Sequence, residues 1–145
     1  RVLFRSPARK AFVWLQGESD GIEHTSKDEY KKKLILLHNS IIEDLGIDVF
    51  LIIRIAKFVD FPCLPIMAAQ EELCADEKGF YMLTRVTGTF SVENGLMQGA
   101  SAPFHYTNAG YDLVGDIAGR NAAKILAGKK AELETEPYPE ISNYM

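Results

Sequence analysis

The stretch from Phe12 to Gly21 constrains the fold of this chain more than any other. Its first half, Phe12-Val13-Trp14-Leu15, is apolar and rich in aromatic and β-branched side chains, as is typical of a buried β-strand. The run stops at Gly17, where side chains with carboxylates, a hydroxyl and an amide crowd together. Because open α/β sheets place their chemistry at the carboxyl ends of core strands, this pattern predicts a strand that leads into a functional turn.

A long amphipathic helix and a second strand follow. Ser26-x-x-Glu29 has the form of a capping box, in which each side chain satisfies a free backbone N–H of the other residue. An apolar stripe at spacings of three and four predicts a helix that Gly46 can end: Tyr30, Leu34, Leu37, Ile41 and Leu45. The apolar run over residues 48–55 is typical of a parallel strand covered on both faces. Together these elements predict a right-handed βαβ unit and an α/β fold.

Shorter elements are expected in the rest of the chain. Residues 56–65 contain Pro62 and Pro65 and predict a loop, residues 66–75 a short helix, and residues 80–83 a third strand. Residues 85–104 are rich in Gly, Ser and Thr and predict a loop. Thr107 is the expected N-cap of a last helix ending near Leu126. Five side chains of that helix are expected to face inward: Tyr111, Val114, Ile117, Ala118 and Ile125. Four small residues suit close packing on the sheet: Gly110, Gly115, Gly119 and Ala122.

Composition narrows the class of protein. With 145 residues, 47% of them hydrophobic, the chain has the size and balance of one globular domain. A net charge of -4 argues against a nucleic-acid partner or an anionic membrane surface, and no run approaches the roughly 18 apolar residues of a membrane span. Cys63 and Cys74 lack CxxC spacing, and with three scattered histidines neither a zinc site nor a cofactor is expected.

Two features are expected to meet where the loops of an α/β sheet converge: the turn from Gln16 to Asp20, and His105 before the last helix. Ester hydrolysis needs a nucleophile, a base, an acid that orients the base, and donors for the oxyanion. His105 can be the base, Glu18 or Asp20 can orient it, and Gln16 with backbone N–H groups can be donors.

The nucleophile has two interpretations. In one, residues 17–21 (G-E-S-D-G) are a G-x-S-x-G nucleophile elbow and Ser19 attacks the ester. An elbow feeds directly into a buried helix, however, whereas here four residues intervene before the capping box. In the other interpretation Ser19 is a turn residue and the nucleophile lies elsewhere.

The second interpretation comes from a resemblance. Trp14-x-Gln16-Gly17-Glu18-Ser19-Asp20, then Tyr30, then Gln70, then the segment 105–111 (H-Y-T-x-x-G-Y), resembles the sialate O-acetylesterase and acetylxylan esterase-like family of SGNH hydrolases, over roughly residues 11–126. The resemblance implies a three-layer αβα, flavodoxin-like parallel sheet and metal-free removal of O-acetyl groups from carbohydrate. It also implies that His105 is the catalytic base and that Gln16 and Gly17 shape the oxyanion site.

The chain departs from the family pattern in two places. The family's nucleophilic serine lies in a G-Q-S-N type segment well before the W-x-Q-G-E block, and this chain contains no such segment. The family also has an aspartate three residues before the histidine, where this chain has Ala102. Glu18 is the nearest candidate to replace that aspartate. A catalytically inactive carbohydrate-binding or structural module is therefore the alternative function, and Ala102 favours it.

The domain boundaries follow from these interpretations. Residues 1–6 look like the translation of a sequencing adapter, so we expect the chain to be truncated at its amino terminus, without the serine and its strand. Residues 7–128 are then the C-terminal part of the esterase domain. Residues 129–145 are acidic and contain prolines, and we expect a flexible surface tail.

Several other side chains have ordinary structural interpretations. Trp14 is expected in the core, His24 in a solvated loop and His38 at the boundary of the helix stripe. Arg54, Phe58 and Asp60 lie near the carboxyl end of the second strand, where side chains can meet a substrate.

Overall fold

The computed structural model describes residues 9–56, 58, 63–99, 102 and 105–145. Within them lie the strands and helices β1 (Ala11–Trp14), α1 (Glu18–Ile22), α2 (Lys27–Leu45), β2 (Val49–Ile53), α3 (Leu64–Asp76), β3 (Phe80–Thr84) and α4 (Asn108–Leu126), and the 3-10 helices η1 (Val86–Thr89) and η2 (Pro139–Tyr144). The adapter-like residues 1–6, Asp60 and half of the loop 56–65 lie outside the described residues.

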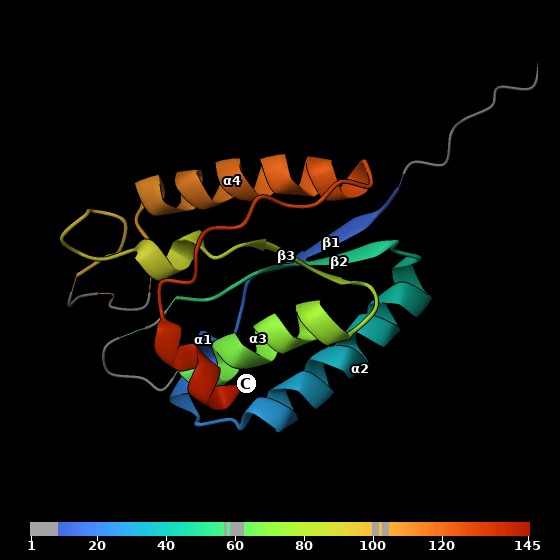
Figure 1. Cartoon of the computed structure of the whole chain (residues 1–145), viewed down its shortest axis with the longest axis horizontal. Helices are drawn as coiled ribbons and strands as arrows, with labels where there is room; N and C mark the ends of the chain where they lie inside the picture. The colour runs from blue at the N-terminus through green and yellow to red at the C-terminus, as the bar shows by residue number, and fades with distance from the viewer. Residues whose placement is uncertain (1–8, 57, 59–62, 100–101, 103–104) are drawn as a thin grey trace, which may run out of the picture.

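The strands form one parallel sheet in the order β1-β2-β3. In Figure 1, α4 lies on one side of the sheet, and α2 and α3 lie on the other. The described residues therefore form an α/β domain with helices on both faces, compatible with a flavodoxin-like αβα fold. The central strand β2 is buried along its whole length, which confirms that its uninterrupted apolar run marks a strand covered on both faces.

Helix α2 begins and ends close to the positions expected from its caps. The Ser26 side chain accepts a hydrogen bond from the Glu29 N–H at 3.2 Å, and Gly46 ends the helix with a φ of 60°. The buried face is Tyr30, Leu34 and His38, whereas Leu45 is 54% exposed, so the stripe leaves the core one turn earlier than expected. His38 is not a boundary residue, because its ring stacks on Phe80 at 4.3 Å between centroids.

Helix α4 has the expected N-cap, since Thr107 Oγ1 accepts a hydrogen bond from the Gly110 N–H at 3.1 Å. Its inward face is only partly as expected. Val114, Ala118 and Ile125 are buried, but Tyr111 is 48% exposed. Among the expected small residues, Ala122 packs against the core, and of the three glycines only Gly110 is in tight contact, because a Cβ there would lie 2.4 Å from the Leu96 carbonyl oxygen. Gly115 and Gly119 face open space and do not pack on the sheet.

The segment after α4 packs along the domain, contrary to the expectation of a flexible tail. The side chain of Asn121 holds it, donating to the Glu132 carbonyl at 3.0 Å and accepting from the Glu132 N–H at 3.0 Å. Further along, Ile141 in η2 is 4% exposed, and η2 packs against α3. In Figure 1 this segment runs back beside α4 and then crosses to η2. Side chains far away in sequence thus order a segment whose own composition is polar.

A search of the described helices finds none with the length and apolar character that crossing a membrane requires.

Candidate functional site

The site at the end of β1 starts at Gly17, whose φ is 151°. Residues other than glycine rarely adopt a positive φ of this size. A Cβ on Gly17 would lie 2.8 Å from Ile66 Cγ2 and 3.2 Å from Ile55 Cδ1. Gly17 therefore allows the end of β1 to approach the segment after β2 and the start of α3. The polar turn expected after it is the short helix α1, because Gly21 N–H donates to the Gly17 carbonyl at 2.9 Å.

A buried hydrogen-bond network fixes the backbone before this glycine. The Gln16 carbonyl accepts one bond from the Tyr30 hydroxyl and one from Gln70 Nε2, both at 2.9 Å. Gln70, which is fully buried on α3, also accepts from the Ile55 N–H at 3.0 Å. Trp14 Nε1 donates to the Tyr30 hydroxyl at 3.3 Å. These bonds join the ends of β1 and β2 to α2 and α3, so the later residues of the motif, Tyr30 and Gln70, have a structural role here.

The side chains of Gln16 and Asp20 bind each other. Gln16 Nε2, just before the N-cap of α1, donates to Asp20 Oδ2 within the helix at 2.8 Å. The structure thus gives the Asp20 carboxylate the Gln16 amide as a partner. An oxyanion held by Gln16 would share this amide with Asp20.

The carboxyl group of Glu18 is half-buried at the first position of α1. Burial raises its pKa, while hydrogen bonds from the N–H groups of Glu18 and Gly17 and the charge of His105 lower it in part. The charge of Glu18 in turn contributes to the raised pKa values of Tyr106 and Cys63, after the larger effect of burial. Glu18, His105, Tyr106 and Cys63 thus surround one region, although 87 positions in the sequence separate Glu18 from His105.

His105 is exposed, and its backbone is held by the segment before it. Its carbonyl accepts from the Gln98 N–H at 2.8 Å, and its N–H donates to the Ala102 carbonyl at 3.1 Å. The next residue, Tyr106, is buried against Phe90. The structure brings His105 together with Glu18 electrostatically. Ala102 contributes only a backbone carbonyl, and its neighbours Pro103 and Phe104 lie outside the described residues.

Ser19 lies within α1 and is exposed. Its carbonyl accepts the Glu23 N–H at 2.9 Å, as in an ordinary helix. A nucleophile elbow places its serine on a strained turn directly between strand and helix. Here the left-handed backbone is at Gly17, two residues earlier, so the local geometry differs from that of an elbow.

The carboxyl ends of β2 and β3 carry an ion network that sequence reasoning missed. Arg54, fully buried after β2, bonds to Glu71 of α3 at 2.8 Å and to both carboxylate oxygens of Glu136. Arg85, after β3, bonds to the same Glu71 at 2.6 Å. Because these partners enclose it, Arg54 does not meet a substrate as expected from its position. The one sequence signal for the network is the acidic run in residues 132–136.

Metal ligation finds no support in the described residues, where no three His, Cys, Asp or Glu side chains gather closely enough to hold an ion. Cys63 and Cys74 are both free thiols.

Comparison with known proteins found no match to the chain among protein-family models, curated proteins or solved structures.

Proposed function

We propose that this chain forms part of a serine esterase of the SGNH hydrolase type, which removes O-acetyl groups from carbohydrate. The observation that carries the proposal is that Glu18, at the end of β1, lies near enough to His105 for the charge of the imidazole to lower the pKa of its carboxyl group, against the larger effect of burial. A carboxylate beside an imidazole is the pair that a hydroxyl nucleophile needs. The resemblance of the W-x-Q-G-E-S-D and H-Y-T segments to the sialate O-acetylesterase and acetylxylan esterase-like family supplies the class of substrate.

In this proposal the nucleophile is a serine from sequence that precedes Arg1. Its Oγ attacks the acetyl carbonyl while His105 takes its proton. The tetrahedral intermediate then collapses, and the sugar hydroxyl leaves with the proton from His105. Water, activated by the same imidazole, hydrolyses the acetyl-enzyme and releases acetate. No metal or other cofactor takes part.

Glu18 has two roles in the proposal. Hydrogen bonds from the N–H groups of Gly17 and Glu18 lower the pKa of its carboxyl group. When the carboxylate turns to the protonated His105, those two N–H groups become free for the oxyanion, and the Gln16 amide, which Asp20 also binds, adds a third donor. One movement would then orient the base and assemble the donors, while Ser19 and Asp20 shape the rim of the substrate site.

The experiment measures acetate release from p-nitrophenyl acetate and from acetylated xylose by the protein completed with its upstream reading frame. We expect activity that falls by about three orders of magnitude or more in His105→Ala. The matched control is His24→Ala, because His24 is an exposed histidine in the loop after α1. Equal loss in both variants, or no loss in either, would contradict the role of His105.

A second function, a catalytically inactive carbohydrate-binding module, is favoured by Ala102 and by the Gln16 to Asp20 hydrogen bond. It predicts that the completed protein binds acetylated sugar in calorimetry without releasing acetate. The elbow alternative makes a third prediction, hydrolysis by the chain as printed and its loss in Ser19→Ala. The same assay therefore separates all three.

A further inference from the structure

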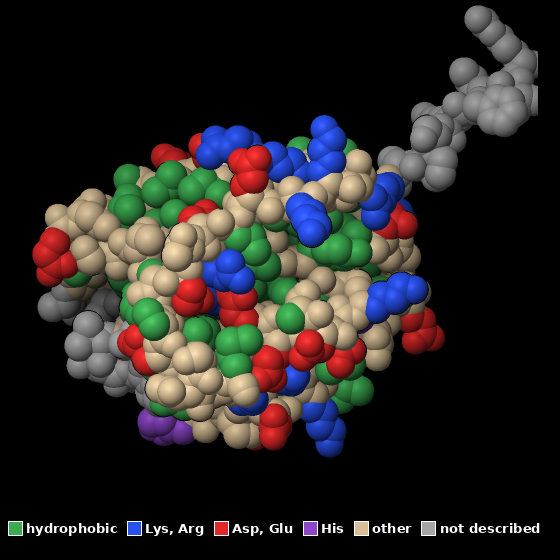
Figure 2. Space-filling view, in the orientation of Figure 1, with side chains coloured by type: hydrophobic (Ala, Val, Ile, Leu, Met, Phe, Trp, Pro, Cys, Tyr) green, Lys and Arg blue, Asp and Glu red, His purple; other side chains and the backbone are tan. Residues whose placement is uncertain are grey.

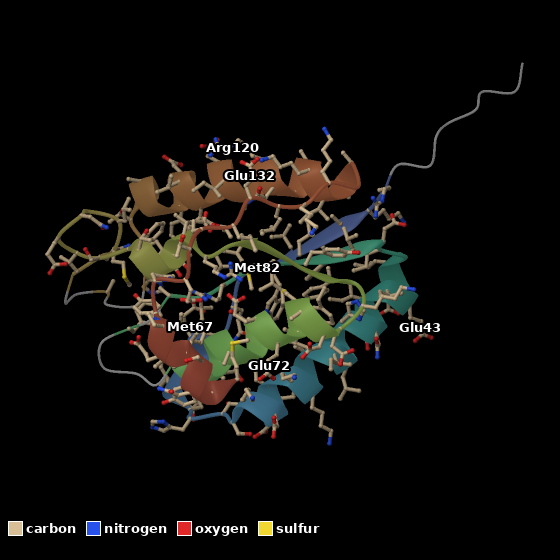
Figure 3. All side chains as sticks on the ribbon, viewed as in Figure 1. Glu43, Met67, Glu72, Met82, Arg120 and Glu132 are labelled. Carbon is tan, nitrogen blue, oxygen red and sulfur yellow. The ribbon has the colours of Figure 1, made fainter. Side chains whose placement is uncertain are left out.

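A groove of about 360 Å³ lies on the β3 side of the domain, away from the proposed esterase site. Its floor is apolar and comes from three elements: Met82 of β3, Cys74 and Ala75 of α3, and Ile125 of α4. Leu133, in the segment after α4, closes one side. Figure 3 shows Met82 between α3 and this segment, and Figure 2 shows hydrophobic side chains in the same hollow. Gln16, Glu18 and His105 do not line it.

The groove exists because β3 is the last strand of the described sheet on that side. Helix α4 and the segment after it cover the carboxyl end of β3, because Asn121 of α4 donates to the Leu83 carbonyl at 2.7 Å and the Glu134 carboxylate accepts from the Arg85 N–H at 2.7 Å. Between α3 and this segment, apolar side chains of the strand and helices remain open to a ligand. A volume near 360 Å³ falls in the range of roughly 300–1,000 Å³ found for small-molecule pockets.

The rim of the groove is basic in an acidic protein. Lys129 and Lys130 line it, and neither side chain has a hydrogen bond or ion pair to a residue that the structure describes. The third cation, Arg85, already binds Glu71. Since the whole chain carries a net charge of -4, two unpaired ammonium groups beside an apolar surface favour a ligand with an anionic end.

We propose that this groove binds a medium-length aliphatic carboxylate. Its chain lies on Met82, Ile125 and Leu133, and its carboxylate lies between the ammonium groups of Lys129 and Lys130. The assignment is independent of the esterase proposal, because it uses none of the residues named there.

The test uses fluorescence titration of the full chain with dansyl-labelled undecanoic acid, whose emission rises in an apolar site, and displacement by decanoate. In the double variant Lys129→Glu, Lys130→Glu we expect affinity to fall by about ten-fold or more, because two attractive charges become repulsive. The control is Lys32→Glu, Lys78→Glu, which changes the net charge equally on exposed residues outside the groove. Affinity in the control should stay within about two-fold of the unchanged chain.

A second variant tests the apolar floor. Ala75→Trp fills the groove from the exposed surface of α3 and should abolish binding, while far-UV circular dichroism verifies the fold. The proposal is overturned if the chain does not bind the probe, if the groove variants bind as tightly as the control, or if methyl decanoate displaces the probe as well as decanoate does.

Discussion

At the scale of single residues, Gly17 contributes an unusual backbone conformation and Glu18 a partly buried carboxyl group to the same short segment. Gly17 adopts a backbone that side chains resist, and this lets β1 approach Ile55 and Ile66. Glu18 then carries a carboxyl group into a partly desolvated position, where burial raises its pKa. A buried charge of this kind costs stability, and such a cost is common where a group is held for chemistry.

Replacing Gly17 by alanine should lower the free energy of unfolding by about 2–4 kcal/mol, because the new Cβ meets Ile66 and the φ of 151° is strained. Urea denaturation measures the change. The matched control is Gly115→Ala, in open space on α4, which should raise the free energy of unfolding by about 0.5–1 kcal/mol. A loss below that range at Gly17 would mean that α3 moves freely away from β1.

Replacing Glu18 by glutamine should raise the melting temperature at pH 7 and leave it nearly unchanged at pH 4. The pKa of Glu18 in the folded state lies above the unfolded value of 4.5. Between these two pKa values the folded state therefore binds more protons than the unfolded state. Stability from this group is therefore present at low pH and lost as the pH rises, and glutamine avoids that loss. In the completed enzyme the same variant should lower kcat by orders of magnitude.

Calorimetry at the two pH values measures the stability effect of Glu18→Gln. Glu23→Gln, in an exposed part of the same segment, is the control and should change little at either pH. An equal shift at both pH values would contradict the desolvation of Glu18. Turnover close to that of the unchanged enzyme would reject its part in catalysis.

At the scale of elements, side chains from distant segments hold the termini of strands and helices. Gln70 and Tyr30 join the ends of β1 and β2 to the helices below the sheet. On the other side, Asn121 of α4 binds the Leu83 carbonyl of β3 and both backbone groups of Glu132. The last segment of the chain is therefore held by a helix side chain at one end and by the burial of Ile141 at the other.

Asn121→Ala should expose the segment after α4 to proteolysis. It removes three hydrogen bonds and leaves the Leu83 carbonyl without this donor, at a cost of about 1–3 kcal/mol. Limited trypsin digestion should then cleave at Lys129 and Lys130 several times faster. The control is Arg120→Ala. Arg120 is labelled in Figure 3 and is exposed on α4, so this variant should be cleaved at Lys129 and Lys130 at the rate of the unchanged chain. Equal rates would show that η2 alone retains the segment.

At the scale of the whole molecule, a buried ion network closes the carboxyl edge of the sheet. Arg54 and Arg85 follow neighbouring strands, and Glu71 lies between them on α3. Glu136 adds a carboxylate from the far end of the chain. Removing one partner of a buried ion pair strongly destabilises the folded state, because the other charge stays buried without a partner. The contacts of Glu136 with Arg54 therefore hold the end of the chain against the sheet.

Because of this network, the melting temperature of the protein should fall as the pH is lowered from 7 to 3. Burial opposes ionisation of Glu136, but hydrogen bonds from Arg54 and the Tyr138 N–H and the charges of both arginines bring its pKa below 4.5. This contribution to stability is present above the unfolded value and is lost as the pH falls through the folded pKa. Glu136→Gln should therefore lower the melting temperature at pH 7 and have a smaller effect at pH 3.

Thermal unfolding followed by circular dichroism between pH 3 and pH 7 measures this dependence. The control is Glu43→Gln at the exposed end of α2, which Figure 3 labels away from the network. Parallel curves for Glu136→Gln and the unchanged chain would show that Glu136 does not contribute to the acid sensitivity.

The sequence alone was sufficient for several local elements: the N-caps at Ser26 and Thr107, the end of α2 at Gly46 and the buried strand β2 were predicted correctly. These features depend on residues within about four positions of one another, so the chain encodes them locally. By contrast, Leu45 in the last turn of α2 and Tyr111 in the first turn of α4 are exposed, although the periodicity assigned both to the inward face. Helical periodicity defines a face but does not show how far a neighbouring element extends beneath it.

Only the tertiary structure decided which distant side chains meet. Gln70 binds the Gln16 carbonyl across 54 positions, Arg54 binds Glu136 across 82 positions, and Asn121 binds the Leu83 carbonyl across 38 positions. Polar side chains can pair with many partners of similar chemistry, and packing of the buried β2 and α3 selects among them by bringing a few within hydrogen-bond reach. The neighbourhood of Glu18 and His105 arises in the same way, because both segments lie at one edge of the sheet.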